Sequence, residues 1–249
     1  MPYYRRVSYS FGPPLTRMVK RLIIIMSAVF VVTNVIGAIP LESARLLLHL
    51  YPIAFLGLTP WLVIHKLFIW QLFTYLFLHG GWFHIIFNLF ALWMFGSDLE
   101  AQWGSDKFLF YFFLTGVGAG VFCVLLEPSS KIPTIGCSGA IFGLLLAYGM
   151  LFPDRPIYLY MFIPIKAKWF VLIMGVIELV ASYSDATSGV SHLAHLGGML
   201  FGFLYLRGPH LPHGLPQRYQ EWRRARLRRK FEVYMRKHEG KDQTGRWIN

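Results

Sequence analysis

Long apolar runs separated by short polar turns dominate the pattern of this chain. We predict six membrane-spanning helices, at about residues 20–40, 82–103, 108–126, 138–152, 167–184 and 190–206. Several of these runs approach the ~20 residues that a helix needs to cross the hydrocarbon core of a bilayer. The fourth run is shorter, as expected for a helix that begins at Ser138, part of the way into the bilayer. The pattern therefore predicts an all-α polytopic membrane protein.

The segments outside and between these runs differ in character. Residues 41–81 are rich in Leu, Trp and Phe but also contain proline and basic residues, a mixture typical of a segment that lies in the membrane interface. We expect a basic N-terminal segment (1–21), a six-helix domain (22–206) and a basic C-terminal tail (207–249).

Charged residues are scarce and lie mostly near the ends of the chain. They make up 14% of the 249 residues, against about 25% in a typical soluble domain. If the six spans alternate in direction, 21 of the 24 Lys and Arg fall on one side, and the other side keeps only Arg45, Lys66 and Lys131. This bias predicts cytoplasmic termini, in a bacterial inner membrane.

The net charge of +12 raises the question of an acidic partner. The basic run at 223–230 predicts binding to anionic lipid headgroups, at about 1 kcal/mol per basic residue near the surface, rather than to nucleic acid. The first apolar run continues without a small-residue cleavage site, so no cleaved signal peptide is expected. Cys123 and Cys137 lie in or beside apolar runs, so the sequence implies no disulfide framework.

Two polar residues lie near the start of apolar runs, Ser138 in Gly-Cys-Ser-Gly and His195 in His-Leu-Ala-His-Leu-Gly-Gly. The fourth and sixth spans enter the membrane from the same, non-cytoplasmic side, so we expect both residues at a similar depth. A hydroxyl at a helix N-terminus lies beside unpaired N–H groups and the positive end of the helix dipole. That environment suits a nucleophile whose reaction product carries negative charge on oxygen.

Glycines at small-xxx-small spacing suggest how these two helices meet. Gly139 and Gly143 lie on the fourth span, and Gly198 and Gly202 share a helix face with His195 on the sixth. Taken alone, the glycines are explained by packing and the histidine by a backbone hydrogen bond. Together they predict that His195 comes within hydrogen-bond reach of Ser138, as for an activated nucleophile.

A third cluster begins before the second span. His84 and Asn88 are four residues apart, so they share a helix face near its non-cytoplasmic end. Buried polar groups there are costly without a function, and we predict that they donate hydrogen bonds to an oxyanion. His79, ahead of two glycines, is expected to tie the preceding loop to the site.

A metal site is the competing interpretation, since His79, His84, His192 and His195 could supply nitrogen ligands. The chain lacks the His-Glu-x-x-His spacing of a hydrolytic zinc helix, so we expect neither a metal nor a cofactor.

The acidic residues give no clear partner for His195. Asp185 is on the correct side but in a loop, and Glu178 is expected to lie past the depth of the site. The roles of Glu178 and His192 stay open, and the simpler prediction is a Ser–His dyad without a third member.

Over about residues 20–206, these features resemble the rhomboid family of intramembrane serine proteases. The matching motifs are His79-x4-His84-x3-Asn88, Gly136-x-Ser138-Gly139 and Ala194-His195-x2-Gly198-x3-Gly202. The resemblance implies a six-helix bundle with Ser138 as nucleophile, His195 as base, and His84, Asn88 and the Ser138 N–H as the oxyanion hole. It also implies that Gly136 is the glycine before the nucleophile and that Glu100 is the acidic residue after the second span.

Two positions depart from the family pattern. Trp70-Gln71 stands where many members have Trp-Arg, and Phe142 stands where a tyrosine often stacks on the base. The resemblance implies an endopeptidase that cleaves transmembrane segments of other proteins. The alternatives are a non-proteolytic member that binds clients and thins the bilayer, and a metal-dependent membrane protein.

Overall fold

The computed structural model describes residues 12–35, 51–159, 163–184 and 191–208. The chain divides into two units, residues 1–206 and 207–249, and the description below concerns the first. The basic tail from residue 209, most of the N-terminal segment and Asp185 lie outside the described residues.

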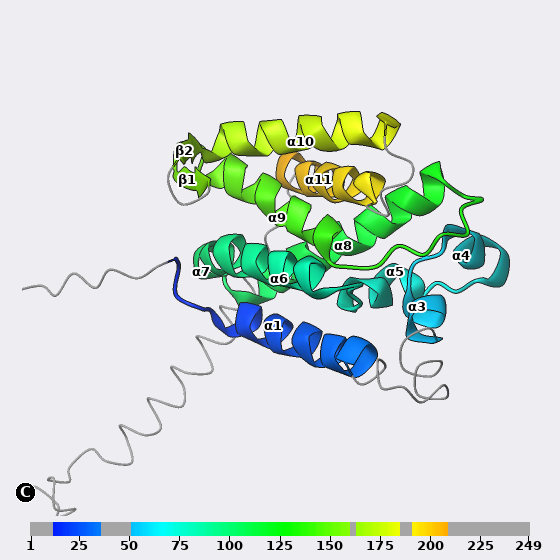
Figure 1. The fold of residues 1–249 in the computed structure, drawn as a ribbon. Coiled ribbons are helices and arrows are strands. Elements are labelled where there is room, and N and C mark those ends of the chain that lie inside the picture. Colours follow the sequence, from blue (N-terminus) through cyan, green and yellow to red (C-terminus); the bar gives the residue numbers. More distant parts are fainter. Residues whose placement is uncertain (1–11, 36–50, 160–162, 185–190, 209–249) are drawn as a thin grey trace, which may run out of the picture. The chain divides into compact units, whose positions relative to one another are not determined.

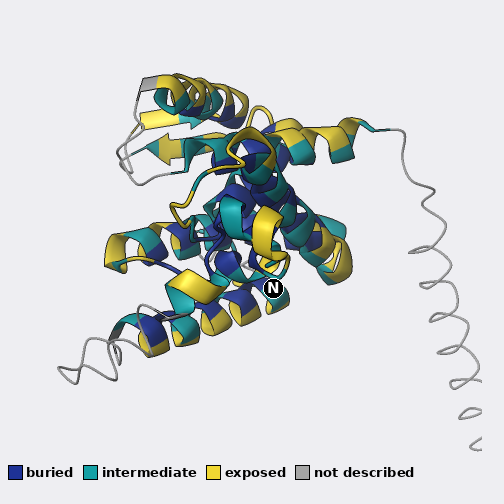
Figure 2. Ribbon diagram, turned by 90° about the vertical axis from the view of Figure 1, so that its right-hand side faces the viewer, coloured by how far each residue is buried: buried dark blue, intermediate teal, exposed yellow. Residues whose placement is uncertain are grey.

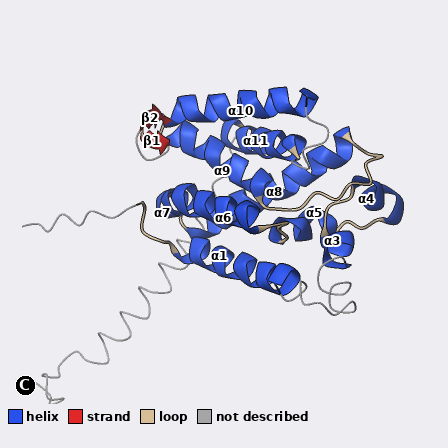
Figure 3. Ribbon diagram, in the orientation of Figure 1, coloured by secondary structure: helices blue, strands red, loops and turns tan. Residues whose placement is uncertain are grey.

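Helices make up nearly all of the regular structure (Figure 1, Figure 3). In chain order they are α1 (Arg17–Phe30), continued by the π-helical turn η1 (Val31–Val35), α3 (Tyr51–Leu56), α4 (Pro60–Lys66), α5 (Gln71–Thr74), the 3-10 turn η4 (Tyr75–Phe77), α6 (Trp82–Ala91), the π-helical turn η5 (Leu92–Gly96), α7 (Ser97–Trp103), α8 (Ser105–Leu126), α9 (Ser138–Leu151), α10 (Ala167–Ser184) and α11 (His192–Arg207). Each of the six predicted spans coincides in large part with one of these helices or with consecutive ones.

A small antiparallel hairpin, which the sequence did not predict, lies between α9 and α10. Its strands are β1 (Pro156–Leu159) and β2 (Ile163–Lys166), and Pro156 is opposite Lys166.

Two helical stretches among the described residues are long and apolar enough to cross a membrane, Trp82–Trp103 and Ser105–Leu126. On the first, Phe83 and Phe87 are exposed whereas Asn88 is buried. Figure 2 shows exposed residues along the outer faces of the helices and buried residues between them. Apolar side chains outside and polar ones inside are expected where the surrounding solvent is lipid.

Helix α8 packs against both α9 and α11. Tyr111 is fully buried and donates a hydrogen bond from its hydroxyl to the Gly143 carbonyl, at 2.9 Å. A Cβ placed on Gly143 would lie 2.5 Å from Thr115 Cβ, and one on Gly118 would lie 2.3 Å from the Phe201 ring. Only glycine fits at such approaches, so these contacts hold α9 and α11 against α8.

The glycine prediction was right for one pair and wrong for the other. A Cβ on Gly198 would lie 1.9 Å from the Gly139 carbonyl oxygen, so α9 and α11 touch there. A Cβ on Gly202 would instead lie 2.4 Å from the Tyr111 hydroxyl of α8. The reason is that α8 fills the space between α9 and α11 one turn further along, where Gly143 also faces it.

Glu100 fastens the start of α1. Its carboxylate accepts hydrogen bonds from the Thr16 and Ser105 hydroxyls and from the backbone N–H groups of Met18 and Val19. The first N–H groups of a helix have no partner within the helix, and a negative charge there is favoured by the helix dipole. Glu100, which lies in α7 near the end of the second span, therefore joins α7, α8 and α1.

The loop before α6 positions the segment that leads to Ser138. Leu58 and Thr134 form an isolated antiparallel bridge, with N–O distances of 2.9 and 2.8 Å. The Gly136 N–H donates to the Tyr75 carbonyl at 2.9 Å. Residues 134–136, which come immediately before α9, are thus hydrogen-bonded to Leu58 and Tyr75 of the segment that precedes α6.

Candidate active site

Ser138 and His195 contact each other at the start of α9 and the first turn of α11. The Ser138 Oγ atom lies 2.7 Å from His195 Nε2. His195 is 7% exposed, whereas Ser138 is only partly buried. The close approach of Gly198 to Gly139, one turn away, sets the separation of the two backbones. A hydroxyl hydrogen-bonded to an imidazole has the geometry of a nucleophile beside a general base.

The ring of Phe142 covers one face of the His195 imidazole. The ring centroids are 4.2 Å apart and the planes differ by 12°. Because Phe142 is one turn after Ser138 on α9, the helix that carries the hydroxyl also orients the base.

His84 and Asn88 of α6 reach the backbone just before Ser138. Gly136 has a φ of +110°, and a Cβ there would lie 2.6 Å from His84 Nε2 and 3.8 Å from Asn88 Nδ2. A glycine is therefore needed both for the backbone conformation and for the close approach.

The hydrogen bonds of these two side chains decide which groups they present. His84 Nδ1 accepts a long hydrogen bond from the Gly80 N–H, at 3.4 Å, so in the neutral ring Nε2 carries the proton. Asn88 Nδ2 donates to the His84 carbonyl at 3.0 Å, and its second N–H is left for another acceptor. Two side-chain donors therefore face the start of α9, as an oxyanion hole requires.

His79 links the preceding loop to the same region. Its carbonyl accepts a hydrogen bond from Asn34 Nδ2 at 2.9 Å, its Nε2 lies 3.7 Å from Cys137 Sγ, and its ring packs edge-on against His84. Burial, together with the nearby His84, lowers the pKa of His79 to about 4. The ring is therefore neutral at pH 7 and acts through packing and hydrogen bonds.

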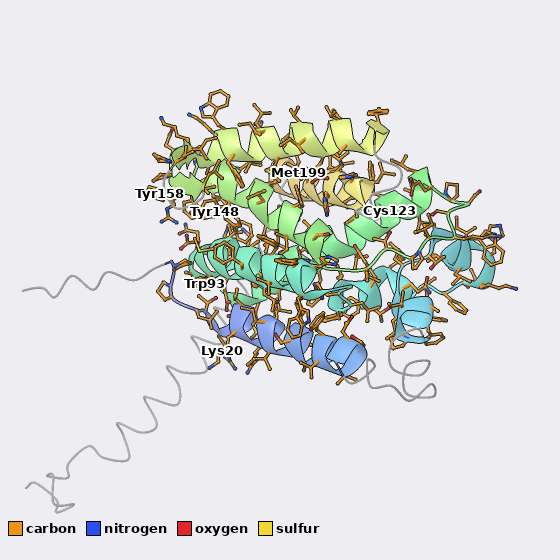
Figure 4. All side chains as sticks on the ribbon, in the orientation of Figure 1. Lys20, Trp93, Cys123, Tyr148, Tyr158 and Met199 are labelled. Carbon is orange, nitrogen blue, oxygen red and sulfur yellow. The ribbon has the colours of Figure 1, made fainter. Side chains whose placement is uncertain are left out.

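The expectation that Glu178 lies past the depth of the site was wrong. Glu178 Oε2 lies 2.9 Å from His195 Nδ1 and 2.7 Å from His192 Nδ1. Glu178 is six residues before the end of α10, and the two histidines are in the first turn of α11. The two helices run side by side in Figure 1, and a Cβ on Gly175 of α10 would lie 3.2 Å from Met199 Cε of α11, a residue labelled in Figure 4. Counting residues along each span could not show that α10 brings Glu178 beside the first turn of α11.

The same three side chains are the group that most resembles a metal site among the described residues. One ligand atom each from Glu178, His192 and His195 lies within 4.8 Å of the others. The distances of 2.7 and 2.9 Å from Glu178 Oε2 are those of hydrogen-bonded or ion-paired groups. A carboxylate shared by two imidazoles accounts for the cluster by itself.

Gln71, which the sequence marked only as a departure from the family pattern, has a structural role next to the site. It is fully buried, its Oε1 accepts from the Thr59 N–H at 3.0 Å, and its Nε2 donates to the Phe55 carbonyl at 3.2 Å. Trp70 Nε1 donates to the same Phe55 carbonyl at 2.9 Å. A neutral amide thus ties the loop together at the position where the family pattern has arginine.

Comparison with known proteins shows the family of this chain. Residues 67–208, more than half of the chain, match the family model described as Rhomboid domain. This range includes every residue of the site from Gln71 to Gly202.

Curated relatives match over part of their length. The chain is 29% identical to "Rhomboid protein 1, mitochondrial" of Saccharomyces cerevisiae over 52% of this chain and 38% of the relative. It is 31% identical to "Rhomboid protease GluP" of Bacillus subtilis over 57% of this chain and 26% of the relative. It is 32% identical to "Rhomboid-like protein 11, chloroplastic" of Arabidopsis thaliana over 53% and 50%, respectively. Relatives from organelles and from a bacterium match alike, so they do not favour a bacterial inner membrane.

Proposed function

The chain belongs to the rhomboid family of helical integral membrane proteins, and on that premise we propose that it is an intramembrane serine endopeptidase. In this proposal Ser138 is the nucleophile, His195 is the general base, and the substrates are transmembrane segments of other membrane proteins. The observation that carries the proposal is the 2.7 Å contact between Ser138 Oγ and His195 Nε2.

The reaction follows from the positions of the polar groups. Ser138 Oγ attacks the peptide carbonyl carbon while its proton passes to His195 Nε2. The oxyanion that forms is stabilised by the Ser138 N–H, His84 Nε2–H and Asn88 Nδ2–H. The C–N bond then breaks as His195 returns the proton to the leaving amine. Water, activated by the same imidazole, hydrolyses the acyl-enzyme.

The proposed membrane arrangement has six spans. They are α1 with η1, the stretch from α6 to α7, α8, α9, α10 and α11. With both termini cytoplasmic, the starts of α9 and α11 face the opposite side, and water reaches Ser138 from there. We further propose that the basic tail binds anionic lipid headgroups.

A site of this kind places requirements on its substrate. A peptide bond inside a helix is shielded by the helix, so the substrate segment must unwind locally before Ser138 can reach the carbonyl. The proposal therefore predicts helix-weakening residues near the cut and a small residue at it.

Cleavage of a helical membrane substrate by the purified full chain tests the proposal. The wild type should cleave it and Ser138→Ala should not, because that change removes only the attacking oxygen. Ser129→Ala, in the exposed turn between α8 and α9, is the matched control and should retain the wild-type rate. A fluorophosphonate probe should label the wild type and fail on both Ser138→Ala and His195→Ala. Cleavage by Ser138→Ala at the wild-type rate would rule out the serine mechanism.

A further inference from the structure

We propose that Glu178 is a positioning residue for His195, so that the site works as a Ser138–His195–Glu178 triad rather than as a dyad. This inference rests on the proposed function, because it assigns Glu178 a role through the base of that reaction.

The three groups follow one another across three helices. His195 Nε2 contacts Ser138 Oγ of α9 at 2.7 Å, and its other ring nitrogen, Nδ1, is 2.9 Å from Glu178 Oε2 of α10. The carboxylate lies off the straight N–H direction, so this close contact needs a small rotation to become an aligned hydrogen bond. Catalytic hydrogen bonds are often poorly aligned before substrate binds and tighten in the transition state.

Glu178 is an unusual residue in its surroundings. It is 6% exposed in a helix whose outward residues, such as Ile177 and Val180, are apolar and exposed. A buried carboxylate is costly unless it is paired, and such residues in membrane spans are commonly functional. The ion-pair partners recorded for it in the described part of the chain are the imidazoles of His192 and His195, with no lysine or arginine.

The charges around His195 favour a role for Glu178 in the transition state. Three titratable side chains face the base, namely His84 from α6, Glu178 from α10 and His192 from its own helix. On α8, Cys123 contacts Ser191, one turn before His195. Glu178 is the acidic group in this set. It therefore stabilises the imidazolium that forms when His195 takes the proton from Ser138.

Proton accounting shows why this stabilisation is selective. In the resting site, the Glu178 carboxylate lies 2.9 Å from His195 Nδ1. With the ring proton on Nδ1, Nε2 is free to accept the Ser138 proton. During attack that proton moves to Nε2, while Nδ1 keeps its own proton and shares it with Glu178 Oε2. A buried negative charge then faces a positive one. The interaction is stronger in the transition state than in the ground state, which is the condition for catalysis.

His192 has a supporting part in this arrangement. Its Nδ1 is 2.7 Å from the same Glu178 oxygen, so it holds the carboxylate turned toward the first turn of α11. Both imidazoles are on α11, three residues apart, so one helix presents both of them to Glu178.

The test is steady-state cleavage of a membrane substrate by the full chain carrying Glu178→Gln, with kcat and KM measured separately over a range of pH. In a serine protease triad, replacing the acid by its amide lowers kcat by about 10⁴-fold, and we expect a loss of roughly 10²–10⁴-fold here, with KM nearly unchanged. The acidic limb of the pH–rate profile should move to lower pH, because the imidazolium loses its carboxylate partner.

Glu178→Asp should recover part of kcat. Glu127→Gln, the same change at an exposed position, is the matched control and should behave as wild type.

A second measurement avoids any change at residue 178. In wild-type protein with isotope-labelled histidine, the His195 Nδ1 proton should give a strongly downfield resonance that is absent from His195→Ala. If the Glu178 carboxylate were only structural, the wild type would lack this downfield resonance. Glu178→Gln would then change stability without changing the pH profile.

The possible outcomes separate this inference from the function on which it rests. Wild-type kcat and pH profile in Glu178→Gln, with Ser138→Ala inactive, would overturn the triad and leave the protease intact. Full cleavage by Ser138→Ala would remove the proposed function itself. Loss of wild-type activity on adding a chelator would overturn the positioning role, because the carboxylate would then be holding an ion.

Discussion

Phe142 stacks on the imidazole of His195, with ring centroids 4.2 Å apart and planes 12° from parallel. The base is therefore held between this ring, on one face, and the contacts of its two nitrogens with Ser138 and Glu178 at its edge. Stacking restricts rotation of the imidazole, and a misplacement of even ~1 Å can cost on the order of 100-fold in rate.

Phe142→Ala should therefore lower kcat by roughly 10- to 100-fold with a smaller change in KM. Phe142→Tyr should stay within a few-fold of wild type, because the face of the ring is retained. Steady-state cleavage assays give both parameters. If Phe142→Ala turned over at the wild-type rate while remaining folded, the stacking would have no part in orienting the base.

Changes at Gly198 and Gly202 should have different consequences although both glycines lie on one helix face. An added Cβ at Gly198 meets the Gly139 carbonyl oxygen at 1.9 Å, and backbone atoms cannot rotate away. At Gly202 it meets the Tyr111 hydroxyl at 2.4 Å, which is the end of a side chain. We expect Gly198→Ala to abolish cleavage by separating α9 from α11.

Gly202→Ala, by contrast, should mainly lower thermal stability, by about 1–3 kcal/mol, with residual cleavage in the protein that stays folded. Gly81→Ala is the matched control, since a Cβ there meets nothing within 4 Å. Equal activity losses at positions 198 and 202 would contradict the assignment of the two glycines to different neighbours.

Asn88→Ala tests the oxyanion hole. Removal of one oxyanion donor costs about 10²–10³ in kcat in serine proteases, and we expect a loss of that order with KM little changed. His65→Ala, on an exposed part of α4, should leave both parameters unaffected and controls for general effects of polar truncation. An increase in KM without a change in kcat would mean that Asn88 binds substrate rather than the oxyanion.

Residue spacing alone predicted the pair at the centre of the site. Helical periodicity places His195 on one face with Gly198, and alternation of spans places Ser138 and His195 at the same end of their helices, where they lie 2.7 Å apart. The first inference uses the spacing of residues along one helix, and the second uses the order of the predicted spans, both of which can be read from the sequence.

The residues that the sequence could not place depend on lateral neighbours. Glu178 reaches His195 because α10 lies beside α11 with one particular face turned inward, and no spacing within either helix reveals that rotation. Gly202 faces α8 for the same reason. Gln71 begins the four-residue helix α5, which is too short for a periodicity that would indicate that its amide is fully buried.

The free energy of unfolding should decrease at acidic pH because of His79. Its pKa is lowered by burial to about 4, below the value of 6.5 of an exposed histidine. Between pH 6.5 and 4 the unfolded chain binds a proton that the folded chain excludes. The contribution is therefore fully present above pH 6.5 and is lost as pH falls, by up to about 3 kcal/mol.

His79→Gln, which cannot take up that proton, should unfold with a weaker pH dependence between pH 6.5 and 4 than the wild type. Thermal unfolding midpoints in detergent at several pH values measure this slope, and the exposed His65→Gln is the control. The same slope in His79→Gln and in wild type would mean that the unfolding of this region does not expose His79.

Gln71→Leu should loosen the loop that holds the segment before Ser138. The change keeps a side chain of similar length but leaves the Thr59 N–H and the Phe55 carbonyl without the amide that now pairs with them. An unsatisfied buried polar group costs about 1–3 kcal/mol, so the unfolding midpoint should fall.

Gln71→Glu should cost more, because a carboxylate can still accept from Thr59 but faces the Phe55 carbonyl with like partial charge. At low temperature, where each variant is still folded, the cleavage rate should stay close to that of the wild type even though the unfolding midpoint is lower. The reason is that the amide acts on Ser138 only through residues 134–136. Loss of cleavage without loss of stability would instead place Gln71 in direct contact with the substrate.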